Sequence, residues 1–362
     1  MISHFQAYHV FEDDDATIIR CSLPTYIQSL DSNNILSEAI ALNCAMAAGI
    51  IADFLGDEQL LPTVSGRMGS GYFEFSIFNK KSNSLVSVDV SNSQIEIDAA
   101  YEGIHSLAII EAKRDLSDDF LVRQLYYPYR VWRDRVTKEV RPVFLIYSNG
   151  IFYLYEYNFK NPTDYSSVEL VRLQKYSIED MEITAQDIQQ IMVSTDIAEE
   201  PNVPFPQADK FERVINLCEL LYEKQLSQEE ITEAYAFDER QTKYYTDSAR
   251  YLGLIEKEEA TNVQSVQRVI SYKLSETGRA ILSLGYKQRQ IAFCGQILQH
   301  RAFSETLKSY FEMGTMPEKE KIVQIMKESK LIMDYSSSTY ERRASTVKSW
   351  LNWIVGLIDE DD

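Results

Sequence analysis

The sequence predicts an α/β domain followed by a mostly α-helical region. β-rich runs mark the first half of the chain, at residues 72–78, 106–110 and 143–155. Beyond residue 209, apolar residues recur with helical spacing. Between the two patterns lies a proline-rich segment with Pro201, Pro204 and Pro206, which indicates a domain boundary. We therefore predict a first domain with an N-terminal elaboration over residues 1–198, a linker over 199–208, and helical domains over 209–286 and 287–362.

Composition limits the class of protein. A chain of 362 residues with 45% hydrophobic content can bury the cores of two or three domains. Its four cysteines show neither the pattern of a disulfide framework nor the spacing of a metal site, which favours a location in the reducing cytoplasm. The start has no secretory signal, and the longest apolar stretch, residues 39–54, is too short for a bilayer. We therefore expect a cytoplasmic protein without membrane attachment.

The first helix is predicted from its two ends. Ser37 is a good N-cap for a helix that runs to about Leu55, and Gly56 follows as the residue that ends it. Glu38 lies in the first turn, where an acid suits the helix dipole. The glycine-rich segment 66–71 lacks the lysine and hydroxyl pair that ends a phosphate-binding loop, so a turn before the next strand is expected there.

Two carboxylates and an ammonium group are predicted to meet at one edge of the sheet. Residues 94–98 indicate a short strand that ends in Asp98, with Ile95 and Ile97 on its opposite face. In residues 106–113, alternation places Glu111 and Lys113 on the face of Leu107 and Ile109, while Ala108, Ile110 and Ala112 take the other face. Carboxylates suit a hard cation such as Mg²⁺, and a lysine nearby can orient a water or help to deprotonate it. Such a group can hydrolyse a phosphodiester, although an acid-x-Lys triplet also occurs by chance at solvated strand ends.

The next elements extend this sheet. Ser117 is predicted to cap a helix through Trp132, which Pro128 should kink or interrupt. Gln124 lies on or beside the inner face of that helix, as an ordinary buried amide or as a functional residue. Residues 141–158 predict a β-hairpin, because Asn149-Gly150 supplies the positive φ angles of a tight turn.

These residues resemble the PD-(D/E)XK nucleases, and most of all their type II restriction endonucleases. The likeness rests on Asp98 to Glu102, on Glu111-Ala112-Lys113 and on residues 120–129, and covers roughly residues 35–160. The Pro-Asp pair of the family name is absent, since Ile97 precedes Asp98. The resemblance implies a mixed-sheet nuclease core in which Asp98 and Glu111 hold Mg²⁺. It also implies that Lys113 positions or activates the attacking water and that Gln124 supports the lysine or the substrate backbone. A helix acid near the sheet adds a metal contact in many members, so Glu38 is a candidate ligand as well as a cap residue.

The helical region begins with three predicted helices. Residues 211–224 predict the first, residues 227–230 form a capping box for the second, and residues 238–241 open the third. A β-like segment at 269–274 and a helix from Ser275 follow. Three helices and a β-like wing resemble a winged helix-turn-helix domain. In the third helix, the resemblance implies DNA contacts from four residues, which also fit an ordinary solvated face: Arg240, Gln241, Lys243 and Tyr244.

A weaker copy of this pattern lies near the C-terminus. Residues 338–341 form a capping box, and Arg342 and Arg343 follow it as candidate DNA contacts of a second helix-turn-helix module. Arg67 is a further candidate contact to a DNA phosphate. Trp350 and Trp353 are predicted to belong to the core.

The expected function is that of a Mg²⁺-dependent, sequence-specific type II restriction endonuclease acting on double-stranded DNA. The sequence leaves open whether the protein forms a homodimer. The net charge of −19 counts against DNA binding, because phosphate contacts supply much of the affinity, unless basic residues gather locally on an acidic body. Two alternatives are a low-specificity repair or phage-defence nuclease of the same fold, and a non-enzymatic winged-helix transcription regulator.

Overall fold

The protein forms two compact units, Met1–Asp180 and Met181–Asp362, which are described separately. The computed structural model describes residues 5–12, 17–32, 35–57, 59–178, 182–235, 239–261, 268–329, 331–332 and 335–358. None of the described helices is long and apolar enough to cross a membrane.

The boundary between the units lies upstream of the proline-rich segment. Residues 182–198, expected in the first domain, belong to the second unit, where α4 (Ala185–Ser194) packs against α9 (Tyr286–Leu298). The expected linker 199–208 is also part of that unit, because Phe205 is buried and stacks on Phe303. Apolar side chains between the prolines therefore fix this segment to a core.

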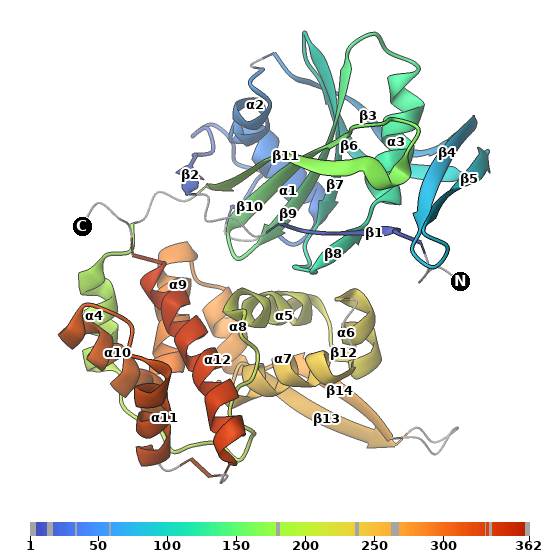
Figure 1. The fold of residues 1–362 in the computed structure, drawn as a ribbon. Helices are drawn as coiled ribbons and strands as arrows, with labels where there is room; N and C mark the ends of the chain where they lie inside the picture. Colours follow the sequence, from blue (N-terminus) through green and yellow to red (C-terminus); the bar gives the residue numbers. More distant parts are fainter. Residues whose placement is uncertain are drawn as a thin grey trace. The chain divides into compact units, whose positions relative to one another are not determined.

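The first unit is built on a mixed seven-stranded sheet (Figure 1). Its strands, in spatial order, are β2 (Ile18–Arg20), β11 (Val168–Ser177), β10 (Ile151–Phe159), β9 (Glu139–Ser148), β7 (Ser106–Lys113), β6 (Gln94–Glu102) and β3 (Leu61–Gly69). β7 runs parallel to β9, and β2 runs parallel to β11, while the other neighbours are antiparallel. The predicted α/β class with a mixed sheet is confirmed.

Helices cover both faces of this sheet at β7. Ala108, Ile110 and Ala112 pack with α1 (Glu38–Ala47) and α2 (Ile50–Leu55) in one core. Leu107 and Ile109 pack with α3 (Arg123–Arg133) in the other. The alternation predicted for this strand is therefore confirmed, and both cores bury residues of the strand that ends in Lys113.

Two helices of the first unit differ from the prediction. Ser37 caps α1 and Gly56 ends α2 in a left-handed conformation, as expected, but the helix breaks at Gly49, which has a φ of +76°. The helix predicted to begin at Ser117, α3, begins instead at Arg123 and has no side-chain cap. The reason is that β8 (Asp119–Leu121) pairs with β1 (Tyr8–Val10) and takes these residues into a strand.

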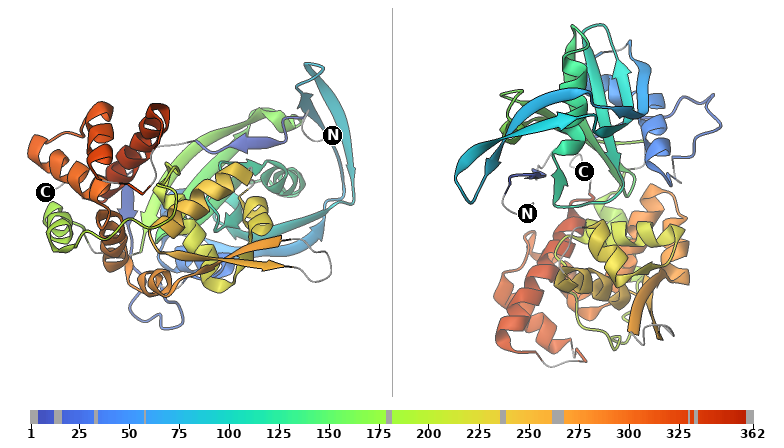
Figure 2. Two further views of the ribbon diagram at one scale, coloured as in Figure 1. Left: turned by 90° about the horizontal axis from the view of Figure 1, so that it is seen from below. Right: turned by 90° about the vertical axis from the view of Figure 1, so that its right-hand side faces the viewer.

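Hairpins complete the first unit. β9 and β10 meet in the predicted turn, where Asn149 and Gly150 have φ angles of +51° and +79°. β4 (Tyr72–Asn79) and β5 (Ser84–Ser91) form a hairpin that projects from the main sheet (Figures 1 and 2). The glycine-rich segment is mostly strand, because β3 extends to Gly69 and pairs with β6; the turn lies at Ser70 and Gly71.

The second unit combines helices with a small antiparallel sheet. The sheet has the order β12-β14-β13. The remaining elements, in chain order, are α5 (Phe211–Glu223), β12 (Leu226–Ser227), α6 (Gln228–Ala234), α7 (Glu239–Tyr251), β13 (Ile255–Thr261), β14 (Arg268–Leu274), α8 (Glu276–Leu282), α10 (Arg301–Met313), α11 (Lys319–Glu328) and α12 (Ser337–Val355).

The helix starts of this unit agree with the sequence in part. Ser227 and Glu230 form the predicted capping box, and Ser275 caps α8. Asp238, the first residue of the predicted third capping motif, lies outside the described residues. α12 is capped by Ser336 rather than Ser338, because the Ser336 hydroxyl is the one that accepts from the Thr339 amide.

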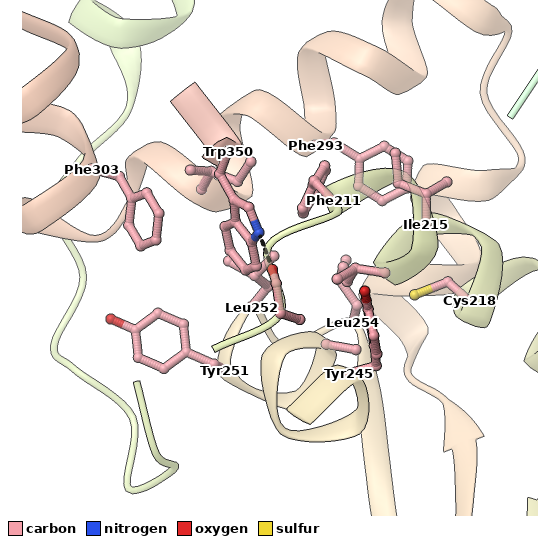
Figure 3. Packing of buried hydrophobic residues seen from close by; sticks show 14 of the residues in the cluster. Phe211, Ile215, Cys218, Tyr245, Tyr251, Leu252, Leu254, Phe293, Phe303 and Trp350 are labelled. Atoms are coloured by element: carbon pink, nitrogen blue, oxygen red, sulfur yellow. Dashed lines mark hydrogen bonds between the residues drawn. The ribbon is translucent and has the colours of Figure 1, made fainter. Parts of the chain in front are cut away.

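Trp350 lies at the centre of the second unit's core. Its ring stacks on Phe303 and contacts Phe211, as Figure 3 shows. The indole Nε1 donates to the carbonyl of Ala208 at 2.7 Å, which satisfies the only polar group of a fully buried side chain. Trp353 packs on the edge of the same core. Both tryptophans are core residues, as predicted.

Candidate active site

Strand β7 loses one of its two neighbours where its charged residues begin. β6 pairs with β7 only as far as Ile110, opposite Ala99. On the other side, the pairing with β9 continues to Lys113, opposite Ile146. The sheet therefore opens between β6 and β7 beside Glu111 and Lys113, and backbone groups at this point need other partners.

Asp98 supplies one of these partners. Between the pairs Gly66–Ile97 and Val64–Ala100, β6 has one residue more than β3, which is a β-bulge at Asp98 and Ala99. The Asp98 side chain accepts a hydrogen bond from the Ala112 amide at 2.8 Å through Oδ2. The prediction that β6 ends at Asp98 is wrong, because the strand continues to Glu102. The bulge, rather than a strand end, brings this carboxylate to β7.

Glu111 is the centre of the contacts at this opening. The residue is 8% exposed, and its Oε1 lies 2.8 Å from Nζ of Lys113. The Gln124 amide, from the second residue of α3, donates to the same oxygen at 2.6 Å. Gln124 thus supports the metal-ligand candidate rather than the lysine. Lys113 also donates to the Ala112 carbonyl at 3.0 Å and lies 3.7 Å from Glu38 in the first turn of α1. Five residues predicted for the site therefore lie together: Glu38, Asp98, Glu111, Lys113 and Gln124.

Burial controls the ionisation of these groups. It raises the pKa of Glu111 to about 7, against the opposing effect of Lys113 and with help from Asp98 and Glu38. Burial also raises the pKa of Glu38. For Lys113, burial alone would lower the pKa, but the neighbouring carboxylates, Glu111 first, hold it above its usual value. Lys113 therefore stays protonated, and it lies between two carboxyl groups, Glu38 and Glu111, whose pKa values are raised.

Asp115 is a site residue that the sequence reasoning missed. It lies two positions after Lys113, and burial raises the pKa of its carboxyl group while Lys113 opposes the shift. Its charge in turn helps to raise the pKa of Glu38. The only sequence signal for it was its position just beyond the acid-x-Lys triplet, where the strand alternation no longer applies.

The donor atoms fit a small hard cation. Among the described residues, no group of three or more His, Cys, Asp or Glu side chains is close enough to form a complete metal site. Mg²⁺, however, is commonly held by one or two carboxylates, with waters and substrate phosphates completing its shell. Asp98 and Glu111 each use one oxygen in the hydrogen bonds above, and the described residues provide no partner for the second. These two oxygens are available ligands. Glu38 contacts Lys113 through Oε1 only, at 3.7 Å, so its second oxygen is available by the same criterion.

The candidate DNA contacts lie elsewhere in the two units. Arg67 is exposed on β3 and forms an ion pair with Glu96 at 3.2 Å, of a kind worth about 0–1 kcal/mol. On α7, Arg240 and Lys243 are exposed, while Gln241 and Tyr244 are half-buried. On α12, Arg342 is exposed, whereas Arg343 is 8% exposed.

Replacing Glu111 with glutamine should make the free energy of unfolding less dependent on pH. The folded state raises the pKa of Glu111 from 4.5 to about 7, so it binds this proton more tightly than the unfolded chain does. The resulting stability is fully present below about pH 4.5 and is lost as the pH rises through about 7. Wild type should lose up to about 3 kcal/mol over this range that Glu111→Gln does not lose. Urea unfolding in a chelator across this pH range tests this, and parallel pH curves for the two proteins would contradict it.

Comparisons with known proteins give two family matches. Residues 3–177 are similar to a domain of unknown function, DUF6997, and residues 213–359 to another domain of unknown function, DUF7226. No curated protein and no solved structure matches the chain. Each family match falls within one compact unit, and neither description assigns an activity.

Proposed function

We propose that the first unit is a Mg²⁺-dependent nuclease of the PD-(D/E)XK kind that hydrolyses phosphodiester bonds in double-stranded DNA as a type II restriction endonuclease. The observation that carries the proposal is the set of contacts around Glu111. Lys113 and Gln124 both bind its Oε1, at 2.8 and 2.6 Å. Asp98 of β6 lies beside them, held by a hydrogen bond from the Ala112 amide of β7. A buried acid with a strongly raised pKa and a specific charged partner is typical of functional sites.

Hydrogen bonds within the first unit orient the two proposed metal ligands. A divalent cation held by Asp98 and Glu111 would supply Lewis-acid stabilisation of charge on the phosphate oxygens. Gln124 orients the Glu111 carboxylate, and the Ala112 amide orients Asp98. Because nearby carboxylates raise the pKa of Lys113, its ammonium group stays protonated at neutral pH. Of the two roles expected for Lys113, positioning the attacking water is therefore favoured over removing its proton.

We further propose that the second unit binds DNA through a winged helix-turn-helix arrangement. Support comes from the order α5, β12, α6, α7, β13, β14, in which a hairpin follows the third helix and projects from the helices (Figures 1 and 2). α7 is then the helix that reads bases in the major groove. Its exposed Arg240 and Lys243 have no carboxylate within ion-pair distance among the described residues.

Plasmid cleavage tests the proposed function directly. The purified full chain should convert supercoiled plasmid to discrete fragments when Mg²⁺ is added. A smear of products would favour a low-specificity nuclease of the same fold. Binding to DNA without any cleavage, with Mg²⁺ or Mn²⁺, would refute the nuclease and favour a non-enzymatic regulator.

Arg240→Ala and Gln241→Ala should weaken binding to the preferred site more than binding to random DNA. Arginine and glutamine pair well with guanine and adenine edges, and each good pair discriminates by about 1–3 kcal/mol. The measurement is the affinity for a specific and a random duplex, in a chelator, at two salt concentrations. Lys224→Ala is the control, because Lys224 is an exposed cation of the same unit outside α7. Equal losses on both duplexes would show that α7 does not read the bases.

A further inference from the structure

The N-terminal half of α12 has two arginines that no described carboxylate neutralises. Arg342 is exposed, and its Nη2 makes a long contact of 3.4 Å with the Thr339 hydroxyl. Arg343 is 8% exposed, and its Nε and Nη1 are buried without a hydrogen-bond partner. A buried cation without hydrogen bonds is costly, so an oxygen-rich anion that supplied acceptors would be bound favourably.

Tyrosine rings, rather than carboxylates, orient the arginines of this region. The guanidinium carbon of Arg343 lies 4.1 Å from the centroid of the Tyr335 ring. On α7, the guanidinium carbon of Arg240 lies 5.3 Å from the ring of Tyr244. A cation–π contact fixes the guanidinium plane without using the N–H donors, although Arg240 Nε also donates to the Tyr244 hydroxyl. Both side chains are thus held in place without their positive charge being cancelled.

Charged groups of α7 act on Arg343 of α12. The pKa of Arg343 lies below its usual value, first because the group is buried, with Arg342 acting in the same direction. Tyr244 and Asp247 of α7 oppose this shift, so they lie near the guanidinium. Asp247 forms an ion pair with Arg250 at 2.8 Å, which takes up its charge within α7. Tyr244, which contacts Arg240, is therefore one of the α7 groups whose charge acts on Arg343.

We propose that Arg342 and Arg343, beside Tyr244 and Tyr335, form a phosphate-binding site that grips the DNA backbone next to α7. This rests on the proposed DNA-binding function and replaces the second helix-turn-helix module with a contact that reads no sequence. A backbone phosphate is an oxygen-rich acceptor of the kind that Arg343 lacks, and the adjacent exposed Arg342 can bind the same anion. Phosphate contacts fix the register of a protein on DNA but do not specify bases.

The salt dependence of DNA binding tests this site. A fluorescent duplex is titrated with the full chain in a chelator, between about 50 and 200 mM salt. Arg342→Gln and Arg343→Gln should each reduce the slope of log affinity against log salt by about 0.9, which amounts to roughly a threefold change across this range. The loss should be the same for specific and random duplexes. Unchanged slopes in both variants would overturn the site.

Lys348→Gln is the matched control. It removes one positive charge from an exposed position of the same helix, six residues after Arg342 and therefore on another face. Its slope should equal that of wild type. A slope change as large as that of Arg342→Gln would mean that general charge, not a built site, governs binding, and would also overturn the proposal.

A folding defect and a failure of the proposed function can each be separated from this test. If Arg343→Gln does not fold by circular dichroism, Arg343→Lys keeps the charge but lacks the planar donors, and should bind DNA more weakly at every salt concentration. Wild-type affinity in Arg343→Lys together with a wild-type slope in Arg342→Gln would refute the site. Cleavage with unchanged slopes refutes the phosphate site alone, whereas altered slopes without cleavage refute the nuclease alone.

Discussion

Lys113→Ala should reduce DNA cleavage by about a hundredfold to a thousandfold, the usual effect of removing a preorganised donor from a reacting centre. The ammonium group lies 2.8 Å from Glu111 and stays charged, so its loss removes the group that we propose orients the attacking water. The fold should survive, because the Glu111 carboxyl can take up a proton when its counter-charge is gone. The measurement is the initial rate of plasmid cleavage in Mg²⁺, with a thermal melt of each protein.

Two companion variants and one control sharpen this prediction. Asp98→Ala and Glu111→Ala should abolish cleavage. Each removes a negative charge that repels DNA, so binding should be kept or strengthened. Lys138→Ala is the control, because Lys138 forms a comparable ion pair with Glu102 at 2.7 Å, near the opposite end of β7. Wild-type cleavage by Lys113→Ala, or an equal loss in Lys138→Ala, would show that the active site has been assigned wrongly.

Removal of divalent cations should abolish cleavage completely. Asp98 and Glu111 offer two carboxylate oxygens to Mg²⁺ or Mn²⁺, so an excess of chelator should stop the reaction. Ca²⁺ should support DNA binding but little cleavage, because its larger and looser coordination shell holds the reacting groups poorly. Full activity in excess chelator would rule out the mechanism.

Cation affinity should also depend on pH in a defined direction. Glu111 has a pKa of about 7, and a carboxyl group must lose its proton to bind a metal ion. Mn²⁺ affinity, measured by calorimetry without DNA, should therefore rise about tenfold per pH unit below this pKa and level off above it. Asp98→Asn should lower the affinity at every pH while the slope stays the same. A pH-independent affinity would exclude Glu111 as a ligand.

Patterns between sequence neighbours predicted much of the first unit. Alternation in residues 106–113 placed Glu111 and Lys113 on one face, and Asn149-Gly150 predicted the turn between β9 and β10. Helix ends at Ser37 and Gly56 followed from cap chemistry. One of these signals failed because of a distant partner: Ser117 did not begin a helix because residues 119–121 pair with β1.

The sequence by itself determined which residues of β7 carry the proposed chemistry, because a strand's two faces depend only on the parity of its residues. Tertiary structure alone decided what surrounds them. The bulge that turns Asp98 toward Ala112 depends on pairing with β3, and the contact of Gln124 with Glu111 depends on how α3 lies across the sheet. In the second unit, tertiary packing buried Arg343 against Tyr335 and brought it near α7. Such contacts join residues far apart in the chain, and no local periodicity encodes their distance.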